Sequence, residues 1–139
     1  MELIDTHCHL TFDDLARDID SILARSIAAG VKAWITVGTD LKENQKAIEL
    51  AERFDGVYAS VGIHPHDAKT VTEDTLKELK KLAQHKKVVA IGETGLDYHY
   101  NLSLHEDQTR VFPTRLNCLW AMNLVAGKRI YFDGSFLSG

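Results

Sequence analysis

The 139-residue sequence contains little cysteine or proline, with two residues of each. Cys8 and Cys118 are too few for a disulfide framework, which favours a reducing compartment. No apolar run approaches the roughly 18 residues that a membrane span needs, and the N-terminus lacks the basic and apolar stretches of a signal peptide. We therefore expect a cytoplasmic protein, or a nuclear one if the source is eukaryotic, with no membrane as partner.

An excess of positive charge is also lacking, because the formal net charge is −4. No overall basic field would attract nucleic acid, so a phosphate-bearing ligand would need a local site or a metal. Hydrophobic residues make up 45% of the chain and charged residues 26%, which is typical of a globular protein. The length is that of one domain.

Short apolar runs alternate with segments of helical periodicity along the chain. Strands are expected at residues 3–5, 33–38, 57–63 and 88–92. Helices are expected at residues 13–29, 40–54, 72–83 and from residue 103 onward. Asp40 is the predicted N-cap of the second helix, and Ser103 with Glu106 forms a predicted capping box for the fourth. The pattern predicts an α/β fold of parallel βαβ units, either a doubly wound sheet or a (β/α)₈ barrel.

The first predicted strand runs into "DTHCHL", which contains His7 and His9. In an extended chain these two side chains share a face while Cys8 points away. Two neutral imidazoles at a rigid strand end form half of a divalent-metal site. An isolated H-x-H is more often part of a polar loop, so this pair alone does not decide the function.

The third and fourth strands also end in polar residues, within "GIHPH" and "IGETGLDYHY". These residues are His64, His66, Glu93, Asp97 and His99. Five of the seven histidines thus follow predicted strands, which random placement would seldom produce. Ligands bind at the carboxyl ends of strands in both candidate folds, so the pattern predicts a metal-dependent site there.

The motifs "DTHCH", "GIHPH" and "AIGETGLDYH", in this order and spacing, resemble those of TatD-type metal-dependent deoxyribonucleases of the amidohydrolase superfamily. The resemblance covers roughly residues 1–112. It implies a (β/α)₈ TIM barrel that hydrolyses phosphodiester bonds in DNA. It also implies divalent cations, Mg²⁺, Mn²⁺ or Zn²⁺, with two ions in the complete family fold.

The resemblance also implies roles for individual residues. The implied metal ligands are His7, His9 and Glu93, of which Glu93 would bridge two ions. His64 corresponds to a family histidine near the substrate phosphate and is, with Glu93, a candidate catalytic residue. His66 is a weaker candidate for contacting the substrate. Asp5 is expected to orient a ligand imidazole through its ring N–H.

The sequence departs from the family in length, because a (β/α)₈ barrel needs about 250 residues. We expect residues 1–112 to form the N-terminal half of a TatD-like hydrolase barrel with four or five strands. Pro113 would interrupt the fourth helix, so residues 113–139 are predicted to be a divergent tail that arises from a shifted reading frame or alternative splicing. Open sheet edges would favour self-association.

Three functions remain open from the sequence. The first is a metal-dependent DNase, whose activity in this short chain is expected to be weak because the family's later histidine and aspartate ligands have no counterpart here. The second is a catalytically inactive truncated isoform that binds one metal or a partner. The third is another amidohydrolase-type enzyme that cleaves an ester or amide. Glu93, in place of a carbamylated lysine, favours the nuclease by resemblance.

Overall fold

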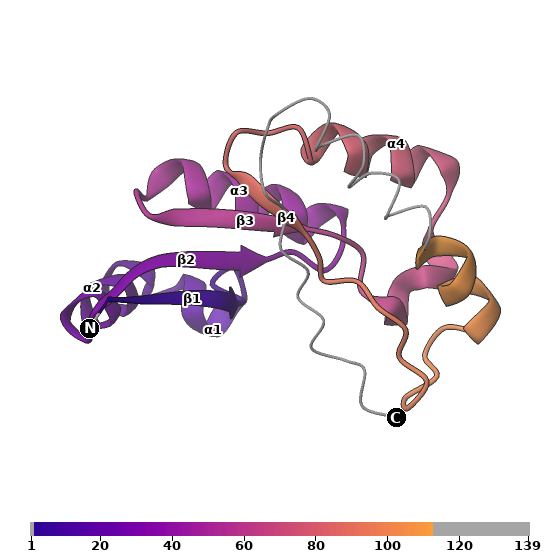
Figure 1. Ribbon diagram of the computed structural model, residues 1–139, viewed down its shortest axis with the longest axis horizontal. Coiled ribbons are helices and arrows are strands. Elements are labelled where there is room, and N and C mark those ends of the chain that lie inside the picture. Colours follow the sequence, from indigo (N-terminus) through magenta and orange to yellow (C-terminus); the bar gives the residue numbers. More distant parts are fainter. Residues whose placement is uncertain (1, 113–139) are drawn as a thin grey trace.

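The structure is a computed structural model that describes residues 2–112 (Figure 1). Four strands form one parallel sheet in the order β1-β2-β3-β4. They are β1 (Leu3–Cys8), β2 (Val31–Val37), β3 (Val57–Val61) and β4 (Val88–Ile91). The helices are α1 (Asp13–Ala16), α2 (Ile19–Ala28), α3 (Leu41–Arg53) and α4 (Glu73–Leu82), with a 3₁₀ segment η1 (Pro65–Thr70) and a further helical stretch at residues 105–112. The predicted α/β fold with parallel strands is confirmed.

The strand order separates the two architectures that the sequence allowed. A doubly wound sheet reverses its strand order at a switch point, whereas the strands of a (β/α)₈ barrel follow the order of the chain. Here the order follows the chain and all four strands point the same way (Figure 1). Right-handed crossovers then place the helices on one face of the sheet. The described residues therefore form part of the wall of a (β/α)₈ barrel.

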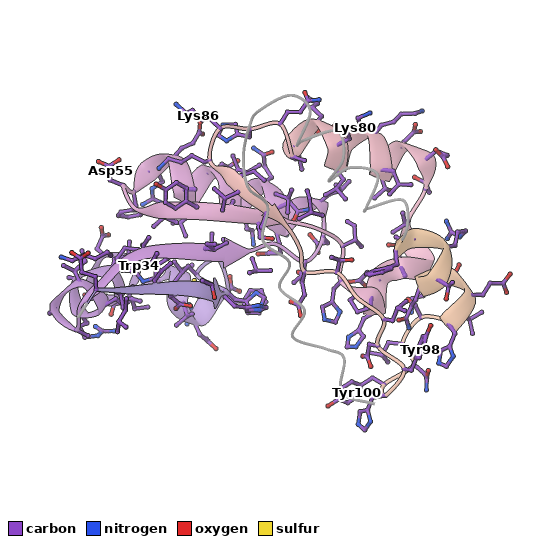
Figure 2. The ribbon with its side chains drawn as sticks, viewed as in Figure 1. Trp34, Asp55, Lys80, Lys86, Tyr98 and Tyr100 are labelled. Carbon is purple, nitrogen blue, oxygen red and sulfur yellow. The ribbon has the colours of Figure 1, made fainter. Side chains whose placement is uncertain are left out.

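The hydrophobic core lies between the sheet and the helices. Val57, Ala59 and Val61 alternate along β3 and are fully buried, together with Leu79 of α4. Alternation places Tyr58 on the opposite face of the sheet, where it is 37% exposed. Figure 2 labels Trp34, buried on β2, and shows Tyr98 and Tyr100 at the other end of the molecule.

The face of the sheet opposite the helices leaves apolar side chains exposed. Ile4 pairs with Ala33, and Ile35 pairs with Tyr58. Ala33 and Ile35 are two residues apart, so all four side chains share one face. Ile4 is 63% exposed. This face corresponds to the interior of a closed barrel.

The prediction of one continuous helix over residues 13–29 was wrong, because the structure has two helices there, α1 and α2. The chain leaves the helical conformation at Asp18 (φ −127°, ψ 34°) and starts again as α2. Ile19 and Leu23 of α2 enter the core, whereas Leu15 of α1 stays exposed. After the break, α2 packs against β2, whereas α1 buries none of its residues.

The capping box predicted from Ser103 and Glu106 was also wrong. The helical stretch begins at residue 105, and the buried hydroxyl of Ser103 serves another purpose. It donates to the carbonyl oxygen of His66 and accepts from the backbone N–H of Lys69. Ser103 therefore attaches the loop after β4 to η1, and its hydroxyl is not available as a cap.

The first turn of α3 is fixed to the ends of β2 and β3. Asp40 caps α3 as predicted, because its carboxylate accepts the backbone N–H of Glu43 at 2.8 Å. Asn44 is fully buried, donates to the carbonyl oxygen of Gly62 at 2.8 Å and accepts its N–H at 3.0 Å. Gly38 must lack a side chain, since a Cβ there would lie 2.1 Å from Oδ1 of Asn44.

The chain after β4 crosses the end of β3 and reaches β2. The N–H of Gly92 donates to Val61, but the N–H of Glu93 donates to the carbonyl oxygen of Gly38 at 3.2 Å. A Cβ on Gly62 would lie 2.6 Å from the carbonyl oxygen of Glu93, so only glycine permits this crossing. The carboxyl ends of β2, β3 and β4 are thus drawn together.

The predicted divergent tail at residues 113–139, including Pro113, lies outside the described residues. Within residues 2–112, none of the helices combines the length and the apolar character that crossing a bilayer would demand.

We expect Asn44→Ala to lower the free energy of unfolding by about 2–3 kcal/mol, because it leaves a buried N–H and a buried carbonyl of Gly62 without partners. Urea denaturation followed by circular dichroism measures this change. Gln45→Ala, at an exposed neighbouring position, is the control and should change stability by less than about 0.5 kcal/mol. Equal stability of the two variants would contradict the structural role of Asn44.

Candidate metal centre

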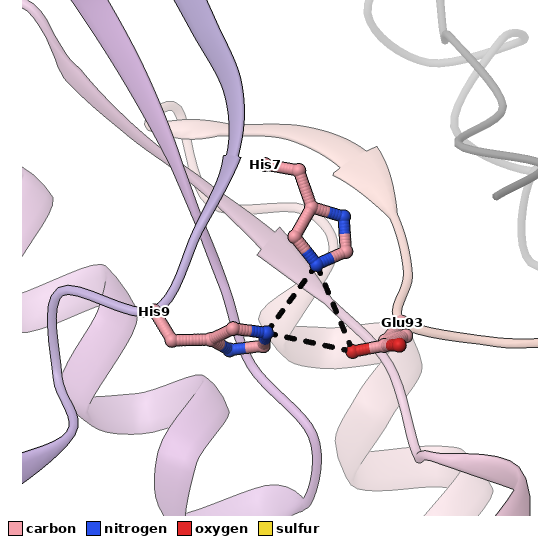
Figure 3. A group of neighbouring side chains, drawn as sticks. All are labelled: His7, His9 and Glu93. Atoms are coloured by element: carbon pink, nitrogen blue, oxygen red, sulfur yellow. Dashed lines mark hydrogen bonds and ion pairs between the residues drawn. The ribbon is translucent and has the colours of Figure 1, made fainter.

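Three predicted ligands meet at the carboxyl ends of β1 and β4, although these strands form opposite edges of the sheet (Figure 3). Nε2 of His7, Nε2 of His9 and a carboxylate oxygen of Glu93 all lie within 4.8 Å of one another. In a flat sheet three strand intervals would separate the edges by about 14 Å. The crossing of the chain after β4 to the end of β2 shortens this separation, because it leaves Glu93 beside the strand that pairs with β1.

The distances among the three atoms suit a shared cation. Nε2 of His7 lies 3.3 Å from Nε2 of His9, and Oε2 of Glu93 lies 3.9 and 3.7 Å from these two nitrogens. A point equidistant from all three lies about 2.1 Å from each, a typical length for Zn²⁺ bonds to histidine and carboxylate. Three ligands from residues 2–112 would leave coordination positions for water, substrate or further ligands.

The ring of His9 is held in one tautomer. Its Nδ1 lies 3.2 Å from the carbonyl oxygen of Val37, which can only accept a hydrogen bond. Nδ1 therefore carries the hydrogen, and the lone pair of Nε2 faces His7 and Glu93. Phe12 stacks on the ring at 4.5 Å with an interplanar angle of 17°. His9 is thus oriented before any metal binds.

The strand around His7 is irregular, because the pairing of β1 with β2 shifts register between Asp5 and Cys8. Cys8 points away, as predicted, and its thiol donates to the carbonyl oxygen of Ile35. Burial raises the pKa of Cys8 to about 12, with a smaller contribution from the charge of Asp5, so the thiol stays protonated and is a poor ligand. Asp5 accepts the backbone N–H of His7 at 3.2 Å. Its predicted role in orienting a ring stays a prediction.

Glu93 is a carboxylate at neutral pH. A hydrogen bond from His64 lowers the pKa of Glu93, burial opposes this effect, and His64, His7 and His9 lower the pKa further through their charges. Oε2 faces His7 and His9, whereas Oε1 lies 3.5 Å from Nε2 of His64. The two oxygens therefore have different neighbours.

His64 faces Glu93 as a donor. Its Nδ1 accepts the backbone N–H of His66 at 3.2 Å, so in the neutral ring the hydrogen is on Nε2, the atom nearest Glu93. Pro65 opens η1 directly after His64 and fixes the turn between the two histidines. In this tautomer His64 orients the Glu93 carboxylate and is not itself a ligand.

Asp97 pairs with His66 through Nε2 of the ring, a contact that the sequence alone did not assign. Burial would raise the pKa of Asp97, but hydrogen bonds from His66 and from the backbone N–H groups of His99 and Tyr100 together lower it. Asp97 is therefore charged at neutral pH and fixes the orientation of the His66 ring.

Two further features of this region could not be found from the motifs. Gln108 is buried and bonds both backbone groups of Asp97, accepting its N–H at 2.7 Å and donating to its carbonyl oxygen at 2.9 Å. His99, although it follows β4, is exposed and lies against Tyr100 at 4.7 Å. Residues 2–112 contain one group of three or more histidine, cysteine, aspartate or glutamate side chains that could hold a metal ion. This group is His7, His9 and Glu93.

Comparison with known proteins gives a consistent family. A family model described as TatD related DNase matches residues 4–123. The chain is 39% identical over 122 residues to a Bacillus subtilis protein named metal-dependent hydrolase YabD, covering 88% of this chain and 48% of the relative. It is 38% identical over 114 residues to the Salmonella typhimurium 3'-5' ssDNA/RNA exonuclease TatD. This match covers 82% of this chain and 44% of that relative.

Solved structures similar to this chain belong to the same family. The hydrolase TatD family protein from Entamoeba histolytica matches with a TM-score of 0.80 and 28% identity, over 87% of this chain and 46% of that one. The TatD homolog YjjV from Escherichia coli K12 matches with a TM-score of 0.76 and 31% identity, over 84% of this chain and 46% of that one. The chain spans slightly under half the length of these relatives. Since the family match covers most of its sequence, this chain belongs to the family of TatD-related DNases.

Proposed function

We propose that this chain supplies part of a metal-dependent site that hydrolyses phosphodiester bonds in DNA. The supporting observation is that His7, His9 and Glu93 meet with distances that suit one divalent cation. The relatives named as a metal-dependent hydrolase and as 3'-5' ssDNA/RNA exonucleases favour this chemistry over hydrolysis of an acyl ester or amide.

The proposed cofactor is Mg²⁺, Mn²⁺ or Zn²⁺, with two ions in the complete family fold. A cation bound by these ligands would polarise a phosphoryl oxygen and lower the pKa of water. His7 and His9 each offer a ring nitrogen, and Glu93 offers a negative charge that would partly neutralise the ion. Because Val37 fixes His9 and His64 fixes Glu93, little reorganisation accompanies binding.

The proposed phosphate-binding side chains are His64 and His66. Nε2 of His64 presents its N–H beside Oε1 of Glu93, where a phosphate oxygen bound near the ligands would compete for it. His66 is held by Asp97 and lies next to His64, with ring centroids 4.2 Å apart. Both imidazoles are partly exposed, so they remain accessible to a substrate. In this role His64 and Glu93 are the catalytic residues.

Metal binding provides the first test. Calorimetric titration with Mn²⁺ or Zn²⁺ should show binding that Glu93→Gln weakens by more than about tenfold, because loss of the carboxylate charge should cost at least as much as the roughly 10–100-fold effects of outer-shell changes. Gly62→Ala should also weaken binding, since its Cβ would displace the backbone of Glu93.

Glu43→Gln is the matched control, because this carboxylate lies outside the centre and bonds Thr11 and Lys46. It should bind the ion as the unaltered chain does. If Glu93→Gln binds as tightly as Glu43→Gln, the ion is held elsewhere and the proposed centre is wrong.

Hydrolysis provides the second test. The chain should release nucleotides from an end-labelled single-stranded oligonucleotide only with added Mg²⁺ or Mn²⁺, and Glu93→Gln should lower the rate at least about 100-fold if the carboxylate is essential. A chelator should stop the reaction, and Glu43→Gln should not change it.

The alternatives predict different results in the same assay. Faster cleavage of an acyl ester than of a phosphodiester would favour another amidohydrolase-type reaction. Metal binding that depends on Glu93 without any hydrolysis would favour the inactive isoform, and would contradict the DNase proposal for this chain. We propose that its activity is low, since it spans under half the length of its relatives.

We also propose that the chain self-associates through its open sheet. The face that carries Ile4, Ile35 and Tyr58 is apolar and partly exposed, and the outer sides of β1 and β4 have no neighbouring strand among residues 2–112. Such edges and faces favour pairing with another chain.

Sedimentation velocity at increasing protein concentration should therefore show growth in mean mass, which Ile4→Lys reduces by placing a charge on this face. Ile27→Lys is the matched control, because Ile27 is equally an exposed isoleucine but lies on α2. A monomer at every concentration, or an equal effect of both lysines, would refute the proposed association.

A further inference from the structure

The loop after β4 exposes two aromatic rings that the proposed chemistry does not use. Tyr98 is 47% exposed and Tyr100 is 67% exposed (Figure 2). Both lie at the end of the molecule toward which the strands point, and the ring of Tyr100 contacts that of His66. Exposed aromatic rings beside a candidate phosphate site suggest a role in binding, since such rings stack on nucleobases in proteins that bind single strands.

A continuous set of contacts connects Tyr100 to the candidate metal centre. The Tyr100 ring lies 5.7 Å from the ring of His66, which lies 4.2 Å from that of His64. Nε2 of His64 is in turn 3.5 Å from Glu93. A strand whose phosphate lies at Glu93 would therefore reach Tyr100 within a few nucleotides.

Tyr100 is exposed but held in place. Its backbone N–H donates to Asp97, whose own backbone is fixed by Gln108. The ring meets His66 at 80° and His99 at 88°, so both imidazoles contact it edge-to-face. A ring held in this way loses little conformational freedom when a base stacks on it.

Tyr98 is also held by neighbouring side chains, but in a different geometry. Its ring lies 3.9 Å from that of His105 at a tilt of 30°, and its hydroxyl is 3.4 Å from the hydroxyl of Thr109. The helical stretch at 105–112 thus supports one side of Tyr98 while nearly half of the residue remains exposed.

A positive charge contacts the loop that carries the tyrosines. The ammonium of Lys69 is 2.9 Å from the carbonyl oxygen of Leu102, in the loop that carries the tyrosines. Because the whole chain has a net charge of −4, a nucleic acid cannot be held by a general basic field. Local stacking and a few local charges would have to supply the affinity.

We propose that Tyr100, assisted by Tyr98, forms a stacking platform for the bases of single-stranded nucleic acid beside the candidate metal centre. This inference rests on the proposed function and adds to it the residues that would hold the bases of a bound strand. Bases in a duplex are already stacked and do not reach the rings, whereas every base of a single strand has a free face. The platform is therefore selective for single strands and tolerant of base sequence.

The test measures binding without cleavage. Fluorescence anisotropy in the presence of a chelator compares a labelled ten-nucleotide oligothymidylate with an abasic strand of the same length and charge. The unaltered chain should bind the oligothymidylate more tightly. Tyr100→Ala should weaken this binding by roughly 5- to 150-fold, the cost of one lost base–aromatic stack, and should leave abasic binding unchanged.

Two variants separate stacking from folding. Tyr100→Trp keeps a ring and should restore binding of the oligothymidylate. Leu104→Ala removes an even more exposed side chain, 71% accessible, from the same loop and should change neither affinity. An equal loss for both strands in Tyr100→Ala would overturn the platform, as would equal affinity of the unaltered chain for the two strands.

The test also separates this inference from the proposed function. If the strands bind as expected but no metal-dependent hydrolysis occurs, the platform stands and the DNase proposal fails. If hydrolysis depends on Glu93 but Tyr100→Ala binds both strands as the unaltered chain does, the platform fails and the DNase proposal stands.

Discussion

The crossing of the chain over the end of β3 is the constraint on which the candidate metal centre depends. Glu93 reaches β2 by donating its N–H to Gly38, and only the missing side chain of Gly62 lets it pass. The buried carboxamide of Asn44 holds Gly62 through two hydrogen bonds and so fixes the surface that Glu93 crosses. Without this crossing, the carboxylate of Glu93 would stay at the far edge of the sheet from His7.

The sequence identified most of the elements but not how they are arranged. Apolar runs with turn residues between them placed all four strands, and Asp40 placed the start of α3. The choice between a doubly wound sheet and a barrel depends on which strands pair, a long-range property that periodicity does not contain. The break at Asp18 and the use of Ser103 in the loop were missed for a related reason, because tertiary contacts outweighed local preference there.

The sequence predicted which side chains form the candidate site, because histidine and glutamate are recognisable as possible metal ligands. The period of two in a strand placed His7 and His9 together, and the rule that ligands gather at strand ends included Glu93. What orients them was not predictable, because the carbonyl oxygen of Val37 that fixes His9 exists in every residue and leaves no trace in the sequence. The pairing of His66 with Asp97 joins residues from two different strand ends and likewise needed the fold.

The side chains of the candidate metal centre all come from the described part of the barrel. The ligands of the candidate centre come from the first and fourth strand ends, so all three lie within residues 2–112. The proposed ion site and the proposed stacking of a base on Tyr100 both take their named side chains from this range. Bridging of a second ion by Glu93, as the family resemblance implies, would use Oε1, the oxygen that now faces His64. Among the described residues, the proposed first ion would use Oε2 of Glu93, which faces His7 and His9, whereas a second ion at Oε1 would have to displace the contact with His64.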